Sequence, residues 1–172
     1  MARQHKSILF LFINGPHHVY HLVIPALRFA ALNNKIETIF ISGNPVNTQI
    51  INDTKAITGI NNFTLVDIPL PLRYRLKNYK NRLYPPVYTR IKKIIKYLEN
   101  ANAIISTSHN FPDYLSRYKI KVPTLFYLYH GTGTREYGFE TSLEKFDHIL
   151  IPGKYHRDRL KESLSLKDDQ IK

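Results

Sequence analysis

The sequence predicts an α/β domain in which helices cover both faces of a mostly parallel sheet of about six strands. Apolar runs of strand length alternate along the chain with longer segments whose apolar residues keep helical spacing. The strand-like runs are nearly continuous, as expected for strands buried on both faces. A chain of 172 residues with 43% hydrophobic and 12% aromatic residues suits one globular domain.

Three of the predicted strands lie in the first half of the chain. The first is residues 7–13 (SILFLFI), and a helix follows Pro16 until Asn33 and Asn34 stop it. Pro25 lies inside this helix and is expected to kink or restart it. The next strand, helix and strand are predicted at residues 36–42, 46–58 and 63–68.

The second half keeps the same alternation. Its strands are predicted at residues 103–107, 123–129 and 146–151, and its helices at residues 87–99, 111–118 and 154–165. This order predicts a Rossmann-like, doubly wound sheet. We expect residues 1–172 to form a single domain, and because the chain stops just after a helix, we expect it to belong to a longer protein.

Composition excludes several classes of site. The chain has no cysteine, which excludes disulfides, cysteine-ligated zinc and cysteine nucleophiles and suits a reducing compartment. The apolar run of residues 8–13 is too short for a signal-peptide core, and no other run approaches the length of a membrane span. We therefore expect a cytoplasmic protein.

The net charge of +12 is concentrated in one segment. Residues 73–96 contain no Asp or Glu, and their nine basic residues are Arg73, Arg75, Lys77, Lys80, Arg82, Arg90, Lys92, Lys93 and Lys96. Such a segment attracts an anionic membrane surface, a phosphate-rich substrate or nucleic acid. The simpler alternative is a solvated basic helix on the surface of a basic protein.

Four clusters of polar or glycine residues follow predicted strands. They are residues 14–18, 106–110, 130–135 and 152–154. Ligands of a parallel α/β sheet bind beyond the carboxyl ends of its strands, so all four clusters are expected at one edge. The candidate substrate-binding residues in them are Gly15, His17, His18, Ser108, Asn110, Gly131, Thr132, Gly133, Thr134, Arg135 and Gly153.

Each cluster also has a simpler interpretation. His17 and His21 share a helix face, but the glutamate of the HExxH zinc motif is absent, so no metal site is predicted. Near a helix start, these histidines line a polar pocket or belong to a plain turn. Ser108 and Asn110 either bind a ligand hydroxyl or cap the helix that follows them. Gly153 either admits a phosphate or forms only a turn.

His130 is the sharpest candidate for a catalytic residue. It ends a buried strand, and the unperturbed histidine pKa of about 6.5 suits proton transfer. Gly131 and Gly133 free the backbone behind it to wrap an oxygen-rich group. The cluster is not a Walker A loop, because GxxxxGK[ST] is absent. It is not a dinucleotide fingerprint either, because Glu136 holds the third glycine position. We therefore predict no cofactor.

The spacing of these motifs resembles a known family. A strand here ends in His-Gly-Thr, and a Phe-Asp strand and a glycine before a helix follow it; the residues are His130, Gly131, Thr132, Phe146, Asp147 and Gly153. This pattern resembles the N-terminal domain of GT-B-type transferases, most closely the CDP-glycerol glycerophosphotransferases of the teichoic-acid kind. The opening with Gly15, His17 and Pro25 also resembles the first loop and helix of many GT-B enzymes.

The resemblance implies one half of a GT-B fold. The N-terminal domain would hold the acceptor, and a C-terminal domain, expected to be absent from this chain, would hold a nucleotide-linked donor, either CDP-glycerol or a nucleotide sugar. His130 matches the family histidine that acts as base on the attacking hydroxyl. The family usually continues His-Gly-Thr-Pro with lysines, whereas this chain has Gly133, Thr134 and Arg135. That departure leaves glycerophosphate transfer, sugar transfer and a related epimerase open.

These inferences lead to one hypothesis and two rivals. The hypothesis is the acceptor-binding half of a GT-B-type transferase in cell-surface polymer synthesis, inactive alone, with Arg135 offsetting negative charge and the basic segment docking on the inner face of the cell membrane. One rival is half of a sugar-nucleotide epimerase, which needs no acceptor. The other is a non-enzymatic basic module that binds anionic lipid or nucleic acid. Nucleic acid is less favoured, because it leaves the histidine and glycine loops without a role.

Overall fold

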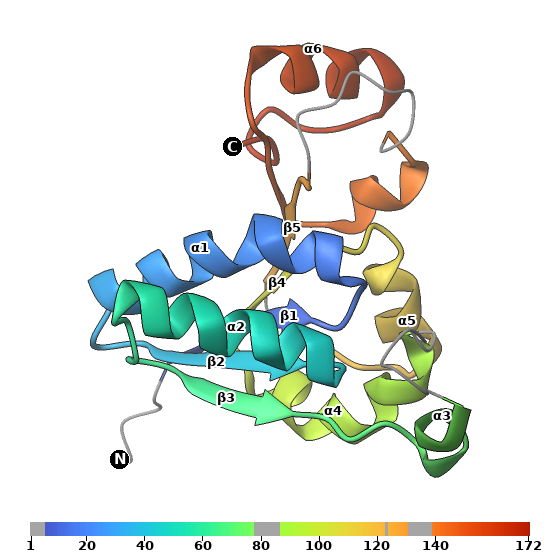
Figure 1. The fold of residues 1–172 in the computed structure, drawn as a ribbon. Coiled ribbons are helices and arrows are strands. Elements are labelled where there is room, and N and C mark those ends of the chain that lie inside the picture. The colour runs from blue at the N-terminus through green and yellow to red at the C-terminus, as the bar shows by residue number, and fades with distance from the viewer. Residues whose placement is uncertain (1–5, 78–86, 123, 131–138) are drawn as a thin grey trace, which may run out of the picture.

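The fold is a six-stranded parallel sheet in the order β3-β2-β1-β4-β5-β6 (Figure 1). A computed structural model describes residues 6–77, 87–122, 124–130 and 139–172. The strands are β1 (Ser7–Phe12), β2 (Glu37–Ser42), β3 (Thr64–Asp67), β4 (Ala103–Ser106), β5 (Leu125–Leu128) and β6 (His148–Leu150). The strand order reverses between β1 and β4, which is the Rossmann-like arrangement. The predicted fold class is confirmed.

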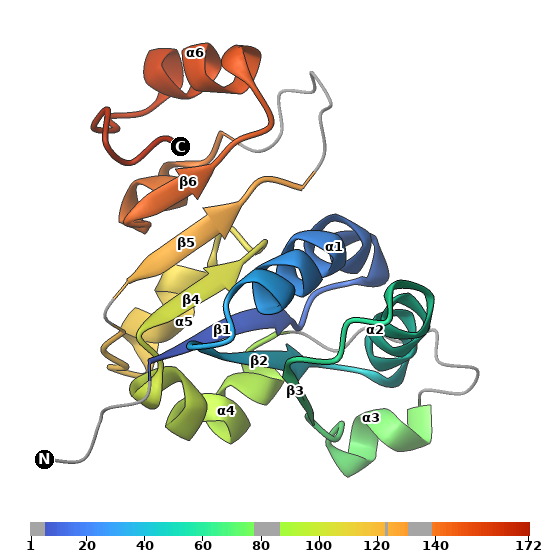
Figure 2. The ribbon, with the colours of Figure 1, turned by 90° about the vertical axis from the view of Figure 1, so that its left-hand side faces the viewer.

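Helices cover both faces of this sheet (Figures 1 and 2). The helical elements are α1 (Pro16–Leu32), α2 (Pro45–Thr58), α3 (Leu72–Lys77), α4 (Tyr88–Asn100), α5 (Phe111–Arg117), the 3-10 turn η2 (Thr141–Lys145) and α6 (Lys154–Ser163). One face of the sheet packs against α1 and α2, and the opposite face packs against α4 and α5.

The apolar run of β1 supplies both cores. Leu9 and Leu11 pack with the α4 and α5 side chains, whereas Phe10 and Phe12 pack with those of α1 and α2. This alternation follows from the two-residue period of a strand. All four side chains are at most 4% exposed, which explains why the sequence shows no polar alternation here.

The predicted elements recur within a few residues, and two short ones are additional. These are α3 and η2. The expected restart at Pro25 does not occur, because α1 runs unbroken through it. A proline removes a single backbone N–H, and the hydrogen bonds of the neighbouring turns hold the helix together.

Candidate functional site

Polar side chains surround a cavity of about 370 Å³ at the carboxyl edge of the sheet. The described residues that line it come from the segments after β1, β4 and β5 and from the start of α4. They are Ile13, Asn14, Gly15, His18, Val87, Arg90, Thr107, Ser108, His109, Asn110, Tyr114 and His130. The topology brings these segments together because parallel strands all end at the same edge.

Buried polar side chains fix the segment after β1. The Asn47 side chain is fully buried, and its Nδ2 donates to the carbonyl oxygens of Phe12 (2.7 Å) and Asn14 (2.8 Å). Asn14 Nδ2 in turn donates to Thr107 Oγ1 across the sheet edge, at 3.3 Å. Gly15 occupies the N-cap position of α1. The first histidines of α1 are therefore presented from a fixed backbone.

Arg90 holds the same segment from the other side of the sheet. It is 1% exposed, and its Nη2 donates to the Ile13 carbonyl oxygen at 2.6 Å. Gly43 makes this approach possible, because a Cβ there would lie 2.8 Å from Ile13 Cα and 3.0 Å from Arg90 Nε. Burial lowers the pKa of Arg90 to about 10, so the guanidinium stays charged at neutral pH.

His18 and His130 form the centre of the site. Their ring centroids are 4.0 Å apart, and the His17 ring lies 4.2 Å from His18 and 6.4 Å from His130. Burial, with repulsion from neighbouring histidines, lowers the pKa of His18 to about 3 and that of His130 to about 4. Both imidazoles are therefore neutral at pH 7 and able to accept a proton.

Tyr127 orients the His130 ring. Its hydroxyl lies 3.3 Å from His130 Nδ1, and its side chain is 1% exposed. Burial raises the pKa of Tyr127, so the hydroxyl keeps its proton. When Tyr127 accepts from Nδ1–H, the Nε2 lone pair of His130 is available to act as a base.

The segment after β4 presents polar groups to the cavity. Ser108 Oγ donates to Asn110 Oδ1 at 2.6 Å, and Asn110 Nδ2 donates to Tyr114 Oη at 3.4 Å. Asn110 takes the N-cap position of α5, but its side chain makes no capping bond. The capping interpretation is therefore wrong for Asn110. His109 Nδ1 lies 3.8 Å from Glu140 Oε2, which adds a carboxylate near the histidines.

The structure brings together five predicted site residues around the cavity. These are Gly15, His18, Ser108, Asn110 and His130. His17 touches the site only through its ring contact with His18. Gly153 is the N-cap of α6 and does not line the cavity. The remaining predicted residues, Gly131, Thr132, Gly133, Thr134 and Arg135, lie outside the described residues.

The predicted basic segment divides between surface and core. Lys92, Lys93 and Lys96 of α4 are exposed, but Arg90 is buried and does not belong to a solvated patch. The inclusion of Arg90 was wrong, because the residue lies on the apolar face of α4. Arg73, Arg75 and Lys77 belong to α3, and Lys80 and Arg82 lie outside the described residues.

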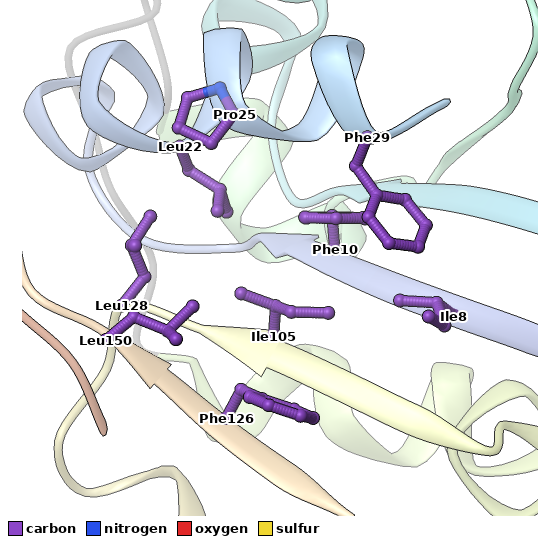
Figure 3. A pocket seen from close by; sticks show the side chains of 9 residues that line it. All are labelled: Ile8, Phe10, Leu22, Pro25, Phe29, Ile105, Phe126, Leu128 and Leu150. Atoms are coloured by element: carbon purple, nitrogen blue, oxygen red, sulfur yellow. The ribbon is translucent and has the colours of Figure 1, made fainter. Parts of the chain in front are cut away.

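A second, apolar cavity of about 280 Å³ lies between α1 and the sheet (Figure 3). Leu22, Pro25 and Phe29 of α1 face strand side chains across it, and Leu128 and Leu150 line it near the ends of β5 and β6. Nothing in the sequence predicted this cavity. Within the described residues, no group of three or more His, Asp or Glu is arranged to hold a metal ion. No helix in that part of the chain is long and apolar enough to cross a bilayer.

The sequence matches no protein-family profile and no curated protein. Two solved structures resemble the fold. LpCGTa in complex with UDP is 12% identical over 96% of this chain and 51% of its own length, with a TM-score of 0.51. Arabidopsis thaliana UGT89C1 complexed with UDP is 10% identical over 87% of this chain and 43% of its own, with a TM-score of 0.48. The chain spans about half the length of these proteins. The likeness to LpCGTa shows a shared fold.

Proposed function

We propose that this chain is the acceptor-binding half of a GT-B-type transferase that uses a nucleotide-linked donor. The observation that carries the proposal is the pair of neutral, touching histidines, His18 and His130, in a polar cavity at the carboxyl edge of the sheet. The fold shared with LpCGTa, a protein solved with UDP, supports the nucleotide-linked donor.

In the proposed reaction, the acceptor hydroxyl sits in the cavity beside His130. Its oxygen forms a bond to the transferred group while the bond from that group to the donor phosphate breaks, and the proton passes to His130 Nε2. The low pKa of His130 leaves this nitrogen unprotonated at pH 7. Negative charge that develops on the departing phosphate would stabilise the imidazolium, and Tyr127 would hold the ring in place.

The donor is proposed to bind a second domain. The two similar solved chains are about twice as long as this one, so we expect the donor site to lie outside these residues and the isolated domain to be inactive. The transferred group is proposed to be glycerophosphate from CDP-glycerol or a sugar from a nucleotide sugar, for cell-surface polymers. An epimerase, by contrast, would turn over the nucleotide sugar without any acceptor.

Substitution of His130 in the full-length enzyme tests the proposal. His130→Ala should lower turnover by roughly 10²–10⁴-fold, the usual contribution of a general base, and leave the circular dichroism spectrum unchanged. His148→Ala is the matched control, because His148 packs on Phe126 and does not line the cavity. Near-normal turnover of a folded His130→Ala enzyme contradicts the assignment.

A further inference from the structure

The fold places the cation of Arg90 at the wall of the polar cavity. Arg90 lies in the first turn of α4 and lines the cavity together with Val87. Its contacts with Ile13 and Gly43 hold it in one position. Because a guanidinium presents five N–H donors in a rigid fork, one bond to a carbonyl does not use its full donor capacity.

The described lining around Arg90 suits an anion. It contains no Asp or Glu; Glu140, which lies beside His109, is not among these residues. Ser108 and Asn110 supply a hydroxyl and an amide, and the neutral imidazoles supply ring nitrogens. The first turn of the 13-residue helix α4 contains no acidic residue, so its dipole adds partial positive charge here.

We propose that this cavity binds an oxyanion, the phosphate or carboxylate group of a substrate, with Arg90 as cationic anchor and Ser108 and Asn110 as hydrogen-bonding partners. The inference concerns the same cavity as the proposed function and rests on it for the role of the substrate. An anion fixed here lies beside His18 and His130, so it would hold a substrate with its reacting end at the histidine pair.

Titration of the 172-residue chain with inorganic phosphate tests the site by NMR at constant ionic strength. We expect saturable shifts at the backbone amides of Gly15 and Ser108 and at the Arg90 Nε–H. Arg90→Met, which keeps the length of the side chain, should weaken binding at least about tenfold, since it removes a charge-assisted contact. Lys35→Met is the matched control. It removes an exposed charge from the opposite edge of the sheet and should change the affinity by less than about twofold.

Shifts confined to exposed lysines, or equal binding by a folded Arg90→Met chain, overturn the proposal. If Arg90→Met fails to fold, the wild-type shift pattern and Ser108→Ala, which should weaken binding, decide the question. Separate titrations identify the source of the anion. Tighter binding of UDP or CDP than of phosphate assigns it to the donor, tighter binding of glycerol phosphate assigns it to the acceptor, and preference for acetate assigns a carboxylate.

The oxyanion site and the proposed function can fail separately. Absence of phosphate binding, with transfer still abolished by His130→Ala, removes only the oxyanion site. Phosphate binding at Arg90, with normal transfer by His130→Ala, removes only the proton-acceptor role.

Discussion

Neutral, touching histidines make the native state sensitive to acid. A histidine in the unfolded chain has a pKa of about 6.5, whereas His18 and His130 have pKa values of about 3 and about 4 in the fold. Between these values the unfolded state binds protons that the native state does not. The free energy of unfolding therefore rises with pH across this window.

We expect the free energy of unfolding to fall as the pH is lowered from 7 towards 4, because protonation of His18 and His130 then favours the unfolded chain. Urea unfolding at pH 7 and pH 5 measures the difference. A double variant, His18→Asn with His130→Asn, should show a smaller fall over the same interval. An equal fall in the variant would assign the acid sensitivity to other groups.

Residue chemistry predicted the histidines but missed the groups that position them. His130, Gly15 and Asn110 stand out in sequence because they follow strands. Asn47 does not, because its bonds to Phe12 and Asn14 depend on how α2 packs on β1. Arg90 carried a usable signal. It lies three residues after Val87 and four before Ile94, on the apolar face of α4, and so was positioned for burial.

At the scale of elements, the close packing of β1, β2 and α4 depends on Gly43. We expect Gly43→Ala to destabilise the fold by about 1–3 kcal/mol, because its Cβ would overlap the Ile13 backbone and press on Arg90. Urea unfolding monitored by circular dichroism measures this. Gly153→Ala is the control and should stay within about 0.5 kcal/mol of wild type, since no atom lies within 4 Å of its Cβ. Equal stability of Gly43→Ala would show that Ile13 and Arg90 can move apart.

Long apolar runs and helical spacing sufficed to place the main elements, but the short ones escaped. The helix α3 is six residues long, and its two leucines, Leu72 and Leu76, are 68% and 77% exposed, so it shows no buried stripe. Tertiary contacts help to hold its position, since Lys93 Nζ donates to the Pro69 carbonyl oxygen just before it (2.8 Å). Such contacts between segments distant in sequence are not visible in local periodicity.

At the scale of the whole molecule, the exposed charge of α4 and the exposed leucines of α3 lie on one side of the sheet (Figure 2). The side chains are Lys92, Lys93 and Lys96, together with Leu72 and Leu76. Basic side chains beside exposed apolar ones suit an anionic bilayer surface. We therefore retain membrane docking as part of the proposed function.

Replacement of Lys92, Lys93 and Lys96 by Gln should weaken binding to phosphatidylcholine vesicles that contain phosphatidylserine by roughly 10²-fold, at about 1 kcal/mol per lysine. Co-sedimentation measures the binding, which should also weaken with salt. The control replaces Lys35, Lys55 and Lys121, which removes the same charge from elsewhere. Equal weakening in both variants, or equal binding to pure phosphatidylcholine, contradicts a specific docking surface.

The central place of β1 has a consequence for synthesis. β1 pairs with β2 on one side and with β4 on the other, and its contact with the segment before β4 joins residues 95 positions apart, Ser7 and Asn102. At about 5–20 residues per second, a ribosome needs on the order of ten seconds to add that stretch. During this interval the most apolar strand keeps one hydrogen-bonding edge unpaired, which is the condition for mispairing between nascent chains. The first half of the molecule is therefore where a chaperone would be needed.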